Sequence, residues 1–231
     1  MENSTLVILR DTLPPKLISG EIVSRMMSLQ DDGVHRVDPR VTEFHCIMPI
    51  ANLASVMNHG ILSHERAAKR AHLSVALQPV QDKRDKKQVP GGLKLHQYAN
   101  LYFHARNPMM YKRQAEPPSL CILRVATMVL TLSGTVISDQ NAASDYVRFL
   151  HPRQWQLLDF DAIYAMDWRH QNDPVAYYRH SSQKCAEVLV PQCVETRYLT
   201  GAYVVDDAVK AGIDALGLAL PVTTNSVLFF R

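Results

Sequence analysis

Residues 183–190 read Gln-Lys-Cys-Ala-Glu-Val-Leu-Val, an apolar stretch that holds a single carboxylate, Glu187. The segment 186–190 predicts a short, buried strand. On such a strand Glu187 is either an outward-facing residue or a carboxylate held in a cleft. A fixed carboxylate in a cleft stabilises the oxocarbenium-like cation that forms when a glycosidic bond is cleaved. Glu187 is therefore the first candidate for a catalytic residue.

The rest of the chain mixes strand and helix patterns without a regular strand–helix–strand rhythm. This mixture predicts an α+β fold rather than a doubly wound sheet. We expect residues 1–40 to form an N-terminal helical extension and residues 41–231 to form one domain, which suits the length of the chain. Helical spacing predicts helices at 15–30, 49–60, 142–150 and 206–216. Apolar and alternating runs predict strands at 44–47, 98–104, 119–126, 128–132, 162–168, 186–190 and 226–230.

Composition excludes several classes of protein. With 47% apolar and 20% charged residues, the chain is not intrinsically disordered. It contains no apolar tract of the roughly 18 residues that a membrane span needs, and residues 1–20 carry no secretory signal pattern. The four cysteines lack CxxC spacing, which favours a reduced, cytoplasmic protein. The ten histidines are scattered, so we expect no metal site.

Positive charge is concentrated in one part of the chain. Residues 65–124 carry 12 basic and 4 acidic side chains, whereas the whole chain has a net charge of only +3. The densest run is Lys83-Arg84-Asp85-Lys86-Lys87, followed by Val-Pro-Gly-Gly, which predicts a loop. Such a run is either a surface that binds a polyanion or a solvated loop.

Two further segments carry side chains suited to ligand binding. The stretch 95–111 interleaves aromatic residues with His96, Arg106 and other polar groups. That composition suits stacking on a nucleobase or on nicotinamide, although a hairpin core with a turn at Asn107-Pro108 would give the same pattern. The second segment, Ser138-Asp-Gln-Asn-Ala-Ala-Ser144, is typical of the start of a helix.

Taken in this order, the segments resemble one family, the DarT ADP-ribosyltransferases that modify DNA bases. The resemblance rests on the strand around Glu187, on Leu95–Met109, and on Asp139–Ala143 followed by Arg148-Phe149. Upstream, Phe44–Ile47 with Asn52-Leu53 and Gly60–Leu62 resembles the NAD-binding entry of the family. The resemblance covers about residues 44–195.

The resemblance implies an ADP-ribosyltransferase-like mixed sheet with flanking helices, which uses NAD as co-substrate. Glu187 matches the catalytic glutamate and Arg84 the catalytic arginine, with Arg106 as the competing candidate for the arginine. On the NAD side, the matched positions are His45, Cys46, Ile47, Met48 and Asn52. The positions expected to contact nucleic acid are Lys83, Lys86, Lys87, His96, Tyr98 and Arg106. Members of this family typically act as toxins, so a separate antitoxin chain is the expected partner.

The nature of the acceptor is suggested by Cys185. Transferases that modify proteins often carry Gln or Glu two residues before the catalytic glutamate, and a thiol replaces that side chain here. A nucleic-acid acceptor is therefore favoured, and a single strand over a duplex, because a stacked base cannot reach the site. We expect a thymine or guanine in DNA, with a base in RNA as the alternative. Plain NAD hydrolysis and an inactive nucleic-acid-binding module are the other interpretations.

Overall fold

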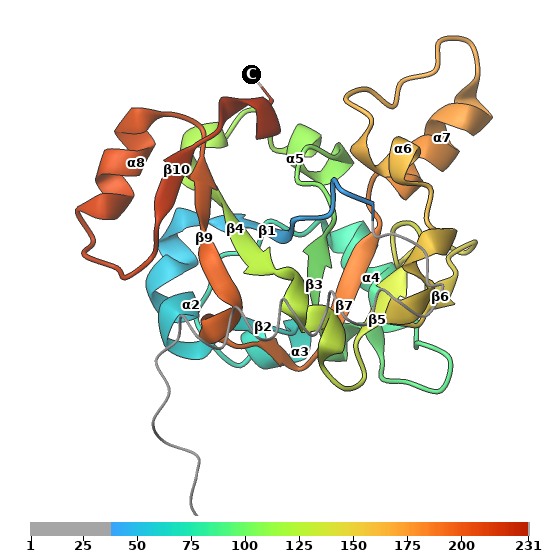
Figure 1. Ribbon diagram of the computed structural model, residues 1–231, viewed down its shortest axis with the longest axis horizontal. Helices are drawn as coiled ribbons and strands as arrows, with labels where there is room; N and C mark the ends of the chain where they lie inside the picture. The colour runs from blue at the N-terminus through green and yellow to red at the C-terminus, as the bar shows by residue number, and fades with distance from the viewer. Residues whose placement is uncertain (1–37, 231) are drawn as a thin grey trace, which may run out of the picture. The chain divides into compact units, whose positions relative to one another are not determined.

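The computed structural model describes residues 38–230, which form a mixed α/β fold around an eight-stranded sheet (Figure 1). The strand order is β10-β9-β4-β1-β3-β7-β5-β6, and all neighbours are antiparallel except the pair β9 and β10. A second sheet pairs β2 with β8. The strands are β1 (Glu43–Pro49), β2 (Ile61–Leu62), β3 (Tyr98–Tyr102), β4 (Leu120–Ala126), β5 (Val136–Ser138), β6 (Phe149–Leu150), β7 (Glu187–Pro191), β8 (Cys193–Val194), β9 (Leu199–Val204) and β10 (Val222–Thr224).

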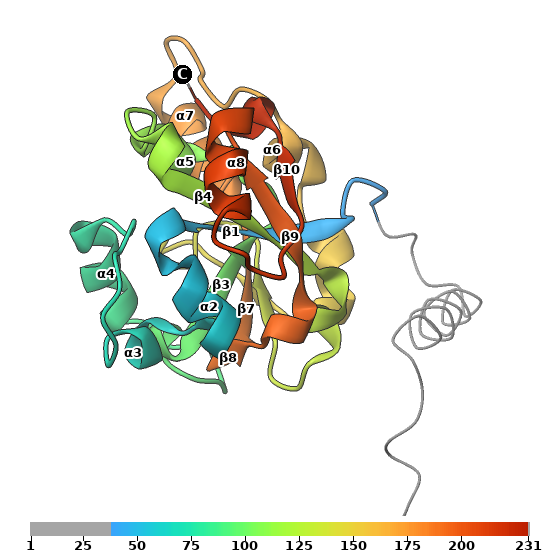
Figure 2. The same cartoon turned by 90° about the vertical axis from the view of Figure 1, so that its left-hand side faces the viewer.

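Helices flank the sheet on both sides (Figures 1 and 2). They are α2 (Leu53–His59), α3 (His64–Ala67), α4 (Gln78–Asp85), α5 (Pro108–Lys112), α6 (Phe160–Tyr164), α7 (Pro174–Gln183) and α8 (Asp207–Asp214). The predicted α+β class is therefore confirmed. The expected helix at 15–30 and most of the expected extension at 1–40 lie outside the described residues.

Alternation along the central strands explains why both faces of the sheet are covered. In β4, Cys121, Leu123 and Val125 point into the main core, whereas Leu120 and Ile122 belong to a smaller cluster on the opposite face. Successive side chains of a strand point to opposite faces, so a strand that is apolar at every position packs on both sides. The sheet is thus a middle layer, and the polar side chains of Ser138 and Glu187 on its strands are enclosed.

Helix α2 ends where the sequence predicts, at Gly60. This residue has a φ of 75°, and a Cβ at this position would lie 2.3 Å from the carbonyl oxygen of Val194. Only glycine fits, because any side chain would meet the backbone of β8 as well as adopt a left-handed conformation. The close approach brings the end of α2 against the small sheet formed by β2 and β8.

Two segments predicted as strands form helical turns instead. Of the run predicted at 162–168, residues 162–164 belong to α6, because the side chain of Asp159 accepts a hydrogen bond from the amide of Ala162 at 2.9 Å and caps a helical turn, and residues 165–168 form neither helix nor strand. The run predicted as a strand at 128–132 forms a 3-10 helix at Thr127–Thr131. Apolar runs of this length fit either a strand or a buried helical turn, so periodicity alone does not separate them.

Two further predictions fail because tertiary contacts take the backbone groups. The expected helix at 142–150 is a loop that ends in β6, since the amide of Ala142 donates to the Glu187 carboxylate. The expected strand at 226–230 contains a 3-10 helix at Ser226–Leu228. The carbonyl groups of Val227 and Phe229 in this segment accept hydrogen bonds from Arg106.

Strand β1 begins with a charge cluster that predicts acid sensitivity. Burial alone would raise the pKa of Glu43, but hydrogen bonds from His45, Arg124 and Tyr203 lower that pKa to about 2. Because the folded pKa lies below the ordinary value near 4.5, the carboxylate stabilises the fold fully above pH 4.5. This contribution, on the order of 3 kcal/mol, is lost as the pH falls from 4.5 towards 2.

We therefore expect urea unfolding at pH 3 and at pH 7 to differ less for Glu43→Gln than for the unmodified chain. The substitution removes the proton uptake that links this site to unfolding. If the free energy of unfolding changed as much between pH 3 and pH 7 in Glu43→Gln as in the unmodified chain, Glu43 would not be the source of the acid sensitivity.

Candidate active site

A row of polar side chains crosses the middle of the sheet. Strand pairing places His45 of β1 opposite Tyr102 of β3, Tyr102 opposite Glu187 of β7, and Glu187 opposite Ser138 of β5. Residues directly opposite each other in an antiparallel pair project from the same face. Four residues that are far apart in sequence therefore share one face of the sheet, with Glu187 in the centre of a layer that is otherwise largely apolar.

Glu187 is almost fully buried, with 1% of its surface exposed, and its carboxylate is paired with Arg84. The Nη1 atom of Arg84 lies 3.0 Å from both Oε1 and Oε2 of Glu187. Arg84 is also buried, at 6% exposure. A buried carboxylate of this kind needs a charged partner and further hydrogen bonds, because desolvation of an unpaired charge is costly. The pair is therefore a fixed, enclosed charge centre rather than a surface ion pair.

The backbone supplies the other contacts of Glu187. Its Oε1 accepts a hydrogen bond from the amide of Ala142 at 2.9 Å, and its own amide donates to Ser138 Oγ at 3.2 Å. Ser138 Oγ donates in turn to the carbonyl oxygen of Gln140. Both contacts of Glu187 come from β5 and the segment that follows it, so the orientation of the carboxylate depends on that segment.

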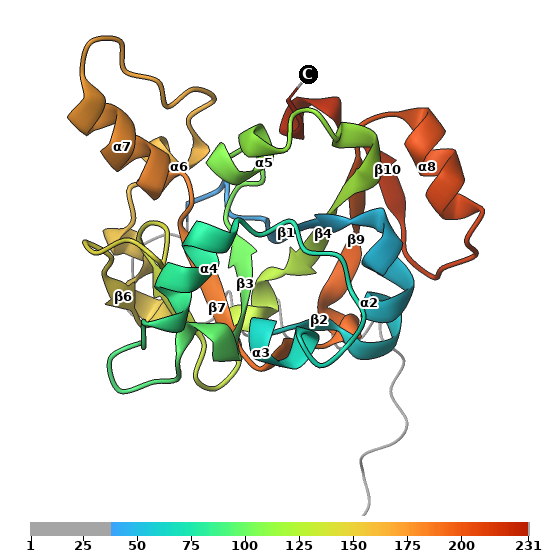
Figure 3. The same ribbon diagram turned by 180° about the vertical axis from the view of Figure 1, so that it is seen from behind.

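Arg84 reaches Glu187 from the last turn of α4, and the predicted loop at Lys83–Lys87 is a helix up to Asp85. Pro79 stands in the first turn, where its missing amide is no loss. Arginine, lysine and glutamine are good helix formers, so the charge density that suggests a loop is equally compatible with a helix. Figure 3 shows α4 in front of β3 and β7. The helix therefore directs one basic side chain inward and leaves its neighbours exposed.

A cavity of about 280 Å³ opens beside the carboxylate. Its wall includes Glu187, Arg84, Tyr102, Asn141 and Met109. Burial raises the pKa of the Tyr102 hydroxyl well above its usual value, and the charge of Glu187 adds to this effect, so the phenol stays protonated. The cavity therefore combines an acid, a cation, an aromatic ring and a neutral hydroxyl.

A second cavity of about 160 Å³ adjoins the first. The two share Arg84 as a lining residue, together with Gln81, Asn100, Val75 and Ala76. The second cavity is further lined by Met48, Asn52, His64, His72 and other residues. Because Arg84 stands between the two spaces, one elongated ligand could contact both of them and the guanidinium at once.

Comparison with known proteins identifies the family of this chain. The family model described as ssDNA thymidine ADP-ribosyltransferase, DarT, matches residues 44–230. The chain belongs to the DarT family. The expected family is thereby confirmed, and the match spans the charge centre, both cavities and all the strands described above except the start of β1.

Relatives with curated names are all DNA ADP-ribosyl transferases. A fusion of DNA ADP-ribosyl transferase and DNA ADP-ribosyl glycohydrolase from Thermosipho africanus is 29% identical over 83% of this chain. This chain spans about half the length of that protein, at 50%. A DNA ADP-ribosyl transferase from Thermus aquaticus is 26% identical over 79% of this chain and 84% of its own length.

Solved structures agree with the fold. Thermosipho africanus DarTG in complex with ADP-ribose has a TM-score of 0.71 at 27% identity, covering 82% of this chain and 51% of that protein. Thermus sp. 2.9 DarT in complex with ADP-ribosylated ssDNA has a TM-score of 0.73 at 22% identity, covering 84% and 99%. The mixed sheet with flanking helices is therefore the DarT fold.

In this DarT-family chain, the residues expected to contact NAD lie in the larger cavity, in the smaller cavity and in the polar row of the sheet. Cys46 and Ile47 line the larger cavity, whereas Met48 and Asn52 line the smaller one. Asn52 also exchanges two hydrogen bonds with the backbone of Leu73, at 2.7 and 3.0 Å, and thus holds the segment that covers the smaller cavity. His45 stands in the polar row, where its Nε2 lies 3.3 Å from Glu43.

The three lysines expected to contact nucleic acid lie on and after α4. Lys83 and Lys86 are exposed. Lys87 is mostly buried and its Nζ binds the carbonyl oxygen of Ser144 and the carboxylate of Asp145, the latter at 3.1 Å. The structure therefore leaves two of the lysines accessible and uses the third to tie α4 to the segment after β5.

His96 and Tyr98, also expected at the nucleic-acid side, take part in internal contacts. His96 Nε2 lies 3.0 Å from Gln81 Oε1, and its ring stacks on His64 at 4.2 Å. Tyr98 is 3% exposed, and its hydroxyl accepts a hydrogen bond from the amide of Leu93. Both residues support the walls around Arg84 rather than form an open surface.

Arg106 does not contact the Glu187–Arg84 pair and binds the C-terminal segment instead. Its Nη1 donates to the carbonyl oxygens of Val227 and Phe229, at 2.8 and 2.7 Å, and its guanidinium lies 4.0 Å from the ring centre of Phe230. Of the two candidate arginines, the structure therefore brings Arg84 to Glu187, and it engages Arg106 with the C-terminal segment.

These contacts predict a structural effect of Arg106→Ala. We expect the free energy of unfolding to fall by roughly 2 kcal/mol, because two charge-assisted hydrogen bonds and a cation–π contact are lost. Urea unfolding measures this loss, and affinity for a single-stranded oligonucleotide, measured by anisotropy on folded protein, should remain unchanged. Weaker binding without a loss of stability would instead place Arg106 in the nucleic-acid interface.

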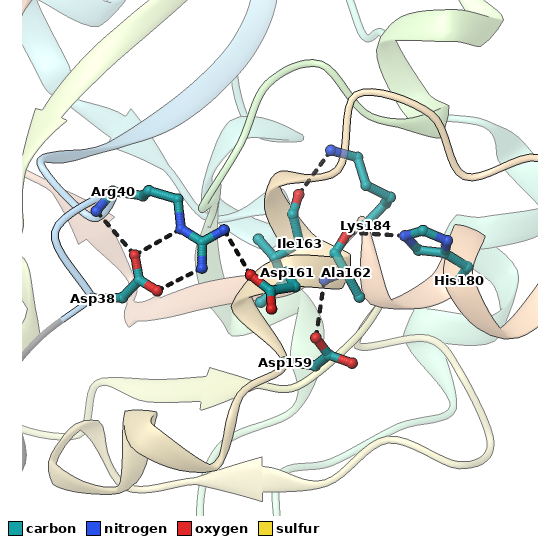
Figure 4. A network of polar contacts seen from close by, with 8 residues as sticks. All are labelled: Asp38, Arg40, Asp159, Asp161, Ala162, Ile163, His180 and Lys184. Atoms are coloured by element: carbon teal, nitrogen blue, oxygen red, sulfur yellow. Dashed lines mark hydrogen bonds and ion pairs between the residues drawn. The ribbon is translucent and has the colours of Figure 1, made fainter.

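A buried lysine anchors the segment before β7 (Figure 4). Lys184 Nζ donates to the carbonyl oxygens of Ile163 and Ala165, at 2.7 and 2.8 Å, and lies 3.1 Å from His104 Nδ1. Burial lowers the pKa of this lysine to about 8. At the other end of α6, Arg40 joins Asp38 to Asp161. Helix α6 is thus fixed at both ends, and Lys184 links it to the start of β7.

The sequence places Tyr102 in the stretch 95–111 that suits stacking but does not single it out as a site residue, and it gives no sign of the Ala142 amide. Tyr102 lies in a stretch whose alternation predicts a strand, but only the register reveals that it stands next to Glu187. The amide of Ala142 has no side-chain signal at all, because a backbone donor looks the same at every position. Among residues 38–230, no group of three or more potential metal ligands is found, and no helix is long and apolar enough to cross a membrane.

Proposed function

We propose that this chain is an NAD-dependent mono-ADP-ribosyltransferase that modifies a base of single-stranded DNA, with thymidine as the acceptor. The observation that carries the proposal is the Glu187–Arg84 pair, at 3.0 Å and almost fully buried, in the wall of the larger cavity. Membership of the DarT family supports it. The related Thermus sp. 2.9 protein, solved with NAD+ and with ADP-ribosylated ssDNA, supports the choice of co-substrate and acceptor.

The described residues fit NAD as a co-substrate. The two adjoining cavities together suit an elongated dinucleotide, and Arg84 between them offers a cation to its pyrophosphate. Only Nη1 of Arg84 contacts Glu187, and within residues 38–230 its other N–H groups have no hydrogen bond. His45 Nδ1 is a buried ring nitrogen without a hydrogen-bond partner among the same residues, but His45 lines neither cavity, so it is not assigned a contact with the dinucleotide.

In the proposed reaction, the bond between nicotinamide and the anomeric carbon breaks, and nicotinamide leaves with the electron pair. The carboxylate of Glu187 binds the ribose hydroxyls and stabilises the positive charge that develops on the sugar. A ring nitrogen of the acceptor base then forms a bond to the anomeric carbon and gives up its proton to solvent water. Arg84 stabilises the negative charge that develops on the base as this proton leaves.

The proposal includes the biological setting of the family. We assign the chain a role as a toxin of the cytoplasm, with an antitoxin partner that reverses or masks the modification. In the Thermosipho africanus relative a DNA ADP-ribosyl glycohydrolase is fused to the transferase. An activity of that type is the partner we expect for this chain.

A panel of acceptors tests the proposed function. The chain is incubated with NAD labelled on its adenylate half and with single-stranded DNA, duplex DNA, single-stranded RNA or protein extract. We expect label on single-stranded DNA and much less on the duplex, because a paired and stacked base does not reach a buried carboxylate. Label on RNA or on protein alone would overturn the assigned acceptor. Loss of nicotinamide without any labelled acceptor would indicate plain NAD hydrolysis.

A further inference from the structure

The segment between β5 and β6, residues 139–148, connects the catalytic carboxylate to the protein surface. Near its start, the amide of Ala142 donates to Glu187 Oε1 at 2.9 Å, and the amide of Asn141 donates to the carbonyl oxygen of Ser182 at 2.9 Å. We call this segment the 139–148 loop. Because its first part is bonded to the site itself, whatever the loop carries is held at a fixed distance from Glu187.

Contacts in its second half also fix the loop. Lys87 Nζ binds Ser144 O and Asp145, while Arg148 donates from its amide and its Nε to the Asp139 carboxylate, at 2.9 and 2.6 Å. The amide of Tyr146 donates to Ser144 Oγ at 3.2 Å. The loop is therefore closed on itself and tied to α4, and the residue at its tip is presented in one position.

The tip of the loop carries Tyr146, which is 88% exposed. It is the most exposed large apolar side chain among residues 38–230. An aromatic ring normally gains free energy from burial, and a ring left in water on a well-fixed loop forgoes that gain. Such a ring is available to stack on a flat ligand, and it needs no rearrangement to do so.

Two lysines of the α4 segment, Lys83 and Lys87, lie on the side of the loop that carries this ring. Lys87 bonds to Asp145, the residue before Tyr146, and the pKa of Asp145 is lowered by that hydrogen bond first and also by the charge of Lys83. Lys83 stands in the last turn of α4, four residues before the Lys87 that binds the loop, and its own side chain is exposed. Cations that follow a backbone beside an aromatic ring that stacks on bases are the recurring elements of single-strand binding.

We propose that Tyr146 stacks on a base adjacent to the acceptor nucleotide of a single-stranded DNA, and that Lys83 contacts the phosphate backbone beside it. The inference rests on the proposed function and extends it to the binding of the flanking nucleotide. The acceptor base has to enter the cavity beside Glu187, which is 1% exposed, whereas Tyr146 stays on the surface. The neighbouring base therefore remains outside, where the ring can hold it.

Fluorescence anisotropy with a labelled single-stranded oligonucleotide tests this inference without relying on transfer. We expect Tyr146→Ala to weaken binding about 5- to 100-fold, since one base–aromatic stack is lost. Tyr146→Phe, which keeps the ring, should bind within about two-fold of the unmodified chain. Tyr178→Ala is the matched control, because Tyr178 is also largely exposed, at 71%, but lies on α7. For Lys83→Gln we expect the slope of log affinity against log salt to fall by about 0.7.

The outcomes separate this inference from the proposed function. Unchanged affinity of Tyr146→Ala, or an equal loss in Tyr146→Phe and Tyr146→Ala, would overturn the stacking role even if transfer to DNA occurs. Equal losses in Tyr146→Ala and Tyr178→Ala would overturn it too. Loss of affinity in Tyr146→Ala alone, together with unchanged thermal stability and unchanged NAD hydrolysis in the absence of DNA, would establish it. Absence of any transfer by the unmodified chain would contradict the proposed function and leave this binding result standing.

Discussion

We expect Glu187→Gln to lower the rate of ADP-ribose transfer to single-stranded DNA by about 10³-fold. The side-chain amide of the new glutamine keeps an oxygen that can accept hydrogen bonds from the Ala142 amide and from Arg84, so the local hydrogen bonds persist. What disappears is the negative charge opposite the developing oxocarbenium ion, which no neutral group replaces. Single-turnover transfer of labelled ADP-ribose measures the effect, with NAD affinity measured in parallel. A drop confined to the chemical step is the result that the geometry predicts.

A matched control for this experiment is Glu195→Gln. Glu195 is an exposed acid in an ion pair with Arg197, at 2.9 Å, close in sequence to β7. Exposed ion pairs of this kind contribute little to stability, so the variant should transfer at the rate of the unmodified chain. If Glu187→Gln also retained near-normal transfer, Glu187 would not be the catalytic carboxylate.

The second large effect concerns Arg84→Ala. Removing the guanidinium leaves a buried carboxylate without its charged partner, and we expect the free energy of unfolding to fall by about 3–5 kcal/mol as well as transfer to be lost. Urea unfolding and the transfer assay measure the two effects. Because either loss could follow from the other, the single variant alone does not separate catalysis from stability.

The double variant Arg84→Ala/Glu187→Gln separates the two effects. It contains no unpaired buried carboxylate, so it should regain about 1–2 kcal/mol of stability relative to Arg84→Ala. It should nevertheless remain inactive, because neither the carboxylate nor the guanidinium is present. Additive losses of stability would show that the two side chains do not interact in the folded protein. Recovery of transfer along with stability would show that the pair has no catalytic role.

The sequence predicts the central strands well because their patterns are local. The strands β1, β3, β4 and β7 all fall within predicted segments, give or take a few end residues, and helix α8 lies inside the predicted 206–216. Some failures are local, because an apolar run such as 128–132 fits a strand or a helical turn equally well. Others lie where a distant group takes a backbone donor or acceptor. The amide of Ala142 is held by Glu187 and the carbonyl of Val227 by Arg106, and neither partner is near in sequence. Propensity has no access to such contacts.

The site is predictable only in part for the same reason. Glu187 is conspicuous as a lone acid in an apolar strand, and Arg84 follows from the family resemblance. Their contact spans 103 residues, and only the fold shows that the guanidinium of α4 reaches β7. Arg106 matches its motif better than Arg84, yet it contacts the C-terminal backbone. A motif match identifies a residue type at a position, whereas strand register decides which side chains meet.

The most direct measurement of the central claim is mass analysis of nucleosides after the chain has acted on a single-stranded oligonucleotide with NAD. The oligonucleotide contains all four bases and is digested to nucleosides after incubation, with Glu187→Gln treated in parallel. We expect ADP-ribose on thymidine with the unmodified chain and none above background with the variant. An adduct on another nucleoside would contradict thymidine as the acceptor. Equal thymidine adducts from both proteins would contradict the catalytic role assigned to the buried Glu187–Arg84 pair.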